Sequence, residues 1–195
     1  MNKNRLEAFS DGVLAIIITI MVLELKVPHG STIAALVPLI PVLMSYLLSF
    51  IYVGIYWNNH HHMMMLVKKV NGKALWANLH LLFWLSLFPF ATAWMGENHY
   101  ESWPVIIYGC IVLMASIAYY ILERILVKLH GPDSAVAVAY GADIKGKIST
   151  VIYILAIAGS FVSSWIGIAG YILVAVIWFI PDTRVEKTIQ KQELE

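Results

Sequence analysis

The segment RLEAFSDGVLAIIITIMVLELKVP, residues Arg5–Pro28, sets the interpretation of the whole chain. It begins with polar residues, is apolar from Val13 to Leu23 except at Thr19, and ends at a proline. The apolar part is too short to cross roughly 30 Å of hydrocarbon, which requires about 20 helical residues. The helix spans a membrane only if its charged beginning also lies at membrane depth, where polar groups must face protein or water. We therefore predict a membrane helix that is not a simple lipid-facing anchor.

One stripe of this helix carries branched apolar side chains and a single hydroxyl. At about 100° per residue, the stripe contains Arg5, Phe9, Gly12, Ile16, Thr19, Ile20 and Leu23. Ser10 and Asp11 point away from it and need polar partners of their own. From the residues alone, ordinary packing against another helix is the favoured interpretation of such a stripe.

The composition predicts an all-α integral membrane protein with one domain, residues 1–195. The chain has 195 residues, 60% of them hydrophobic, and a mean hydropathy of +0.76. Six spans of about 20 residues would use some 120 residues and leave no room for a separate soluble domain. The apolar runs place these transmembrane helices at about 5–25, 33–57, 75–95, 103–122, 148–164 and 166–180.

Several classes of function are disfavoured by the residues present. A net charge of +1 argues against a nucleic-acid partner, and the single Cys110 provides neither a disulfide framework nor a cysteine-rich metal site. The consecutive histidines 60–62 point in different directions on a helix, so we expect no metal site there. No nucleophile, acid–base pair or GxxxxGK loop accompanies His80. We expect no enzyme activity, no cofactor and no cleavable signal peptide.

The beginning of the first helix resembles a known family. Arg5–Asp11, RLEAFSD, is similar to the RxxxFSD signature that opens each six-helix repeat of the transmembrane protein 175 family of potassium channels. LELKVP at residues 23–28, LxPFAT at 87–92 and WFIPDTRVE at 178–186 also resemble that family. The resemblance covers nearly the whole chain, which has the length of one repeat, whereas the animal members resemble two repeats fused.

The resemblance implies a potassium-permeable pore. Four copies of a single-repeat chain would form a homotetramer in membrane lipid, with the first helix of each copy lining a central pore. Ile16 would then form the tightest ring, with Ile20 and Leu23 as further apolar constrictions that gate by dewetting. Thr19 would contribute a ring of hydroxyls that favours potassium over sodium, since the chain lacks a TVGYG-type filter. The other interpretation of Thr19 is a hydrogen bond to the Ala15 carbonyl alone.

We also predict a polar cluster that positions the first helix. Trp57 and a following histidine match the family's Trp-x-x-His pattern, and a histidine can donate to a carboxylate from either ring nitrogen. Asn78 lies at the membrane depth of Asp11 if consecutive helices are antiparallel. The predicted members are Arg5, Phe9, Ser10, Asp11, Trp57, His60, His61, Asn78 and His80.

The distribution of basic residues predicts the orientation. With six spans, twelve of the thirteen Lys and Arg residues fall on one side, and only Lys26 falls on the other. The positive-inside rule then places both termini in the cytoplasm of a prokaryotic cell, with the protein in the plasma membrane. A secondary carrier remains the alternative, although carriers usually have internal repeats and interrupted helices at the midplane.

Overall fold

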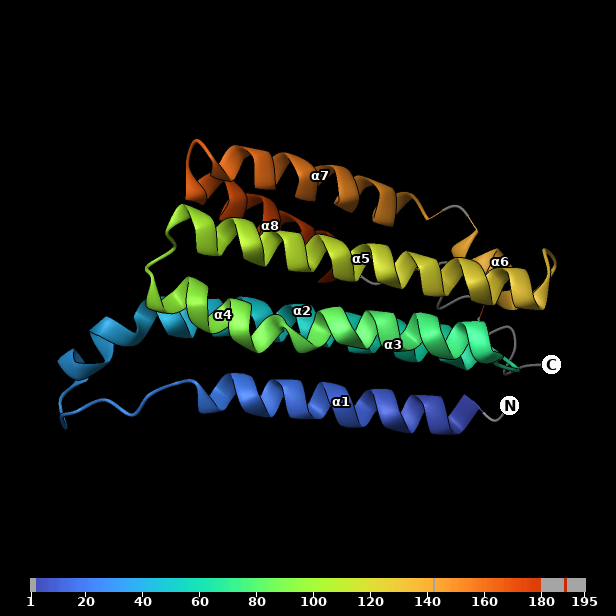
Figure 1. The fold of residues 1–195 in the computed structure, drawn as a ribbon, viewed down its shortest axis with the longest axis horizontal. Helices are drawn as coiled ribbons and strands as arrows, with labels where there is room; N and C mark the ends of the chain where they lie inside the picture. Colours follow the sequence, from blue (N-terminus) through green and yellow to red (C-terminus); the bar gives the residue numbers. More distant parts are fainter. Residues whose placement is uncertain (1–2, 142, 180–187, 189–195) are drawn as a thin grey trace.

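Long helices run side by side to form the protein (Figure 1). The structure is a computed structural model that describes residues 3–141, 143–179 and 188. Helix α1 lies at one edge of the bundle, α7 and α8 lie at the opposite edge, and α2 to α5 lie between them (Figure 1). The elements are α1 (Lys3–Leu23), η1 (Ile33–Leu39), α2 (Ile40–Leu66), α3 (Gly72–Ser86), α4 (Phe88–Glu97), α5 (Ser102–His130), α6 (Ala135–Tyr140), α7 (Ile144–Ser160) and α8 (Ser164–Phe179).

Prolines shape the second and third predicted spans. The segment from Ile33 begins as the 3-10 helix η1, which contains Pro38, and α2 then starts with Pro41 in its first turn, where a missing N–H is tolerated. Helix α2 continues to Leu66 rather than ending near 57. The third span begins at Gly72 and is interrupted at Leu87, because Pro89 stands in the first turn of α4.

The segment between the predicted spans 103–122 and 148–164 is partly helical. Helix α5 continues past Leu122 to His130. The Ser134 side chain accepts a hydrogen bond from the Ala137 N–H and caps α6, and Asp143 caps α7 in the same way through the Gly146 N–H at 3.0 Å. Most of the WFIPDTRVE motif, from residue 180 onward, lies outside the described residues.

Four helical segments among the described residues are long and apolar enough to cross a membrane by length and composition. They are Lys3–Leu23, Ile33–Leu66, Gly72–Glu97 and Ser102–His130, and the apolar helix Ser164–Phe179 is shorter. Helices α7 and α8 have 17 and 16 residues, near the lower limit of a spanning helix. The protein is therefore an all-helical membrane protein with at least four segments of spanning length.

Hydroxyl groups hold the middle of the bundle together. The Thr92 hydroxyl donates to Ser49 Oγ at 2.6 Å, and Ser49 Oγ lies 3.1 Å from the Tyr108 hydroxyl, which joins α4, α2 and α5. The Tyr52 hydroxyl donates to the Tyr171 carbonyl at 2.6 Å and joins α2 to α8. Buried polar groups in an apolar bundle need such partners, so these bonds fix how the helices that support α1 are placed.

Candidate functional site

Helix α1 has one face turned into the chain and one face turned away from it. The inward residues are spaced three or four apart, pack on α2, α3 and α4, and are Leu6, Ser10, Leu14, Ile17 and Met21. On the outward face, Ile16 is 60% exposed and Leu23 is 75% exposed. Phe9 and Ile20 are exposed on the same face. The apolar residues of the predicted stripe are therefore largely uncovered by the described part of the chain and are available to meet another surface or water.

Thr19 lies in the middle of this exposed stripe. Its hydroxyl donates to the Ala15 carbonyl at 2.8 Å. A hydroxyl has one donor and two acceptor lone pairs, so this bond uses the proton and leaves the oxygen lone pairs on the exposed side of the helix. The Thr19 hydroxyl can therefore donate to the Ala15 carbonyl and accept a contact from an ion at the same time.

A short chain of hydrogen bonds holds the beginning of α1 to α3 and α2. The buried Ser10 hydroxyl donates to the Leu6 carbonyl at 2.8 Å and accepts from the Asn78 side-chain amide at 2.9 Å. The Asn78 amide oxygen lies 2.9 Å from His60 Nε2. All three side chains are buried. The structure thus brings together Ser10, Asn78 and His60 of the predicted cluster.

The Asp11 carboxylate lies beside these bonds but outside the buried part. The Trp57 indole N–H donates to Asp11 Oδ1 at 3.0 Å, and both side chains are exposed in the single chain. The His61 ring stacks on Trp57 with 5.8 Å between centroids. A tryptophan, rather than a histidine, is the partner of Asp11.

Besides His61, which only stacks on Trp57, three predicted members take no part in these hydrogen bonds. Arg5 and Phe9 are exposed on the outward face of α1. His80 accepts a hydrogen bond from the Trp84 indole at 2.9 Å within α3, because residues four apart share one face of a helix. The predicted single cluster is therefore two neighbouring groups, one buried and one exposed.

Two contacts fix the ends of α1. The Lys3 ammonium donates to the Met64 carbonyl of α2 at 2.8 Å. At the other end, Lys26 Nζ lies 2.5 Å from Glu97 Oε1 at the end of α4. The hydrogen bond that the Lys26 ammonium donates to the Glu97 carboxylate raises the pKa of Lys26. Because both side chains are exposed, this ion pair orients the segment after α1 more than it stabilises the fold.

Comparisons with known proteins decide the family. A potassium channel from Chryseobacterium sp. (strain P1-3) is 57% identical over 191 residues, which is 98% of this chain and 100% of that protein. The family profile described as endosomal/lysosomal potassium channel TMEM175 matches residues 5–89. The chain belongs to the TMEM175 family. The family resemblance predicted from the RLEAFSD segment is thereby confirmed.

A solved TMEM175 structure has the same fold. It is the crystal structure of a lysosomal potassium-selective channel TMEM175 homolog from Chamaesiphon minutus, with a TM-score of 0.77 and 29% identity. The match covers 90% of this chain and 95% of that one. The mouse endosomal/lysosomal proton channel TMEM175 is 32% identical over 133 residues, 60% of this chain but 27% of that protein. The part that matches the TMEM175 profile contains α1 from Arg5 onward and every predicted site residue.

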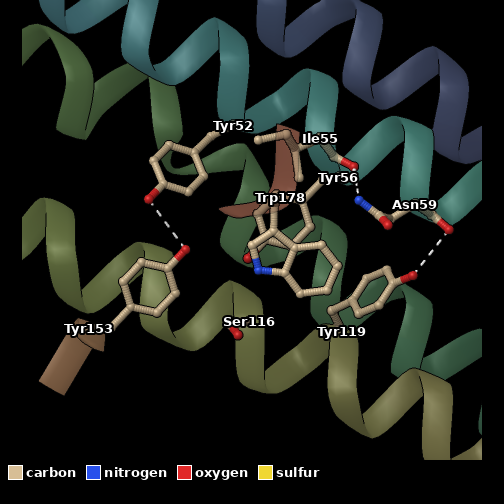
Figure 2. Close-up of a pocket in the computed structure, with 8 residues that line it drawn as sticks. All are labelled: Tyr52, Ile55, Tyr56, Asn59, Ser116, Tyr119, Tyr153 and Trp178. Carbon is tan, nitrogen blue, oxygen red and sulfur yellow. Dashed lines mark hydrogen bonds between the residues drawn. The ribbon is translucent and has the colours of Figure 1, made fainter. Parts of the chain in front are cut away.

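The TMEM175-family chain also contains a small cavity bordered by tyrosine hydroxyl groups, which no sequence motif indicated. It has a volume of about 40 Å³, and its lining comes from α2, α5, α7 and α8, without α1: Tyr52, Ile55, Tyr56, Asn59, Ser116, Tyr119, Tyr153 and Trp178 (Figure 2). The Tyr153 hydroxyl donates to Tyr52 at 3.3 Å, and the Tyr119 hydroxyl donates to the Asn59 carbonyl at 3.1 Å. A cavity of this size has room for water, which needs about 10–15 Å³. Tyrosines inside apolar runs give no separate signal in the sequence.

Proposed function

We propose that this chain is a subunit of a potassium-permeable channel and that α1 lines its pore. The observation that carries the proposal is the outward face of α1, where Ile16, Thr19 and Leu23 are exposed although the opposite face is tightly packed. The names of the Chryseobacterium and Chamaesiphon relatives, both potassium channels, support the choice of ion. The permeant species is the potassium ion, which passes down its gradient without a TVGYG filter.

One helix cannot enclose a pore, so the proposal includes assembly. Four chains would surround a central axis, each contributing α1, in a homotetramer. Each chain would cross the plasma membrane of a prokaryotic cell six times, with α3 and α4 together as one span and α7 and α8 as the last two. Lys3, Lys68, Lys73 and Lys128 lie at one end of the bundle, at helix ends or in the loop after α2. That distribution favours a cytoplasmic location for both termini.

Ile16 is proposed as the narrowest ring of this pore. It lies five residues after the Asp11 carboxylate on the exposed face. Ile20 and Leu23 follow it toward the other end of α1 and would form two further apolar rings. An apolar neck excludes water and therefore stops ions when the helices approach one another.

The test is potassium efflux from vesicles of phosphatidylethanolamine and phosphatidylglycerol that contain the purified protein. Ile16→Asn should increase the efflux several-fold, because a polar ring holds water where an apolar ring does not. Leu155→Asn is the control, since Leu155 is 64% exposed, similar to Ile16 at 60%, but lies on α7. Equal efflux from both variants would contradict the role of Ile16. A flux that requires a second, co-transported ion would instead indicate a carrier.

A further inference from the structure

A long apolar groove lies between α2 and α8, and the described part of the chain leaves it open. Its volume is about 530 Å³. The α2 wall includes Met44, Leu47 and Ile51, and the α8 wall includes Ile172, Val176 and Phe179. The groove is separate from the outward face of α1, because no residue of α1 lines it.

Tyr100, in the segment between α4 and α5, contacts both walls and defines one end of the groove. The Tyr100 hydroxyl donates to the Pro41 carbonyl at 2.7 Å, next to the start of α2. The Tyr100 ring also packs on Trp165, at the start of α8, with 5.5 Å between centroids. Tyrosine and tryptophan are typical of the membrane–water interface. This end of the groove therefore lies at the level of lipid headgroups.

The lining indicates the chemistry of a ligand. Within residues 3–141 and 143–179, no charged side chain lines the groove. Its two hydroxyl groups, those of Ser45 and Tyr100, both donate to the Pro41 carbonyl, at 2.9 and 2.7 Å. A molecule in the groove would meet hydrocarbon side chains and would find no hydroxyl proton free to bind it. The ligand is therefore apolar along its length.

The length of the groove suits an acyl chain. From Trp165 to Phe179 the α8 wall rises about 21 Å, at about 1.5 Å per residue. That length covers one leaflet, which is half of roughly 30 Å of hydrocarbon.

We propose that the groove binds one acyl chain of a membrane phospholipid, whose headgroup lies beside Tyr100 and Trp165. Helix α8 lies at the edge of the bundle opposite α1 (Figure 1). Lipid can therefore reach the groove even where α1 faces other copies of the chain. The bound phospholipid would belong to the leaflet at whose surface α2 and α8 begin.

Photolabelling of the full-length protein tests the site. The vesicles contain phosphatidylethanolamine and phosphatidylglycerol, with a small fraction of phosphatidylethanolamine that carries a diazirine in its acyl chain. After illumination, peptide mass mapping should find more label on Met44–Ile51 and Ile172–Val176 than on Ile154 and Leu155, which are exposed on α7 outside the groove.

Filling the groove should remove the label. Leu47 and Ile172 are half-exposed, so Leu47→Trp and Ile172→Trp add volume inside the groove without disturbing the buried core. Leu155→Trp is the matched control on α7 and should keep the groove label. Native mass measurement should show one retained phospholipid per chain for the wild type and the control, and none for the two groove variants. Equal labelling of both faces, label that persists in both groove variants, or crosslinks from Leu47 to a second chain would overturn the proposal.

Discussion

The prediction at the scale of a single residue concerns Thr19 and the preference of the channel for potassium over sodium. Its oxygen lone pairs are exposed while its proton is bonded to the Ala15 carbonyl. Thr19→Val keeps the shape of the side chain and removes the oxygen. A neutral polar contact contributes about 1 kcal/mol and 1.4 kcal/mol corresponds to tenfold, so the potassium-over-sodium preference should fall by roughly fivefold. Bi-ionic flux through reconstituted protein measures it, with Thr19→Ser as the control that retains the hydroxyl. An unchanged preference in Thr19→Val would leave Thr19 a packing residue.

Residue spacing predicted the two faces of α1 but not the partners of its polar groups. A period of 3.6 separates Leu6, Ser10 and Leu14 from Ile16 and Thr19 whatever surrounds the helix. The partner of Asp11 depends on which side chain of α2 reaches it. Trp57 and His61 are four residues apart, so both lie on the same face of α2, and only the placement of the helices selects the indole.

Helix α1 as a unit depends on its buried bonds to α2 and α3. Asn78→Leu would leave the buried Ser10 and His60 side chains without their partner, at a cost of about 1–3 kcal/mol for each polar group. The unfolding midpoint of the Asn78→Leu variant in detergent should therefore fall clearly below that of the wild type. His80→Leu breaks only a bond to Trp84 within α3 and should lower the midpoint less. Equal midpoints for the two variants would show that the Ser10–Asn78–His60 bonds do not anchor α1.

Helix boundaries were predictable where proline sets them and not where buried charges do. Pro89 explains the interruption at Leu87. The end of α5 was predicted too early, because Glu123 and Arg124 resemble the start of a loop. In the structure Arg124 pairs with the buried Glu123 and donates to the Tyr140 carbonyl at 2.8 Å, so the helix continues to His130. The carbonyl that accepts from Arg124 belongs to Tyr140, the last residue of α6, and the sequence did not indicate this helix.

The assembled protein is predicted to contain four chains. Arg5 and Asp11 are exposed within α1, so this side of the helix would be a poor surface toward lipid in a single chain. Native mass measurement in mild detergent should find a mass near four times 21.9 kDa, plus bound lipid. A monomer that conducts potassium after reconstitution would contradict the assembly.

Cysteine accessibility along α1 tests the pore-lining role of this helix most directly. In a Cys110→Ser background, single cysteines are placed at Thr19, Ile20 and Leu23 on the outward face and at Leu14, Ile17 and Met21 on the inward face. A charged methanethiosulfonate reagent is then applied during potassium flux. We predict block at the three outward positions and little effect at the three inward ones, which face α2, α3 and α4. Block confined to the inward positions, or unchanged flux at all six, would contradict a pore lined by α1.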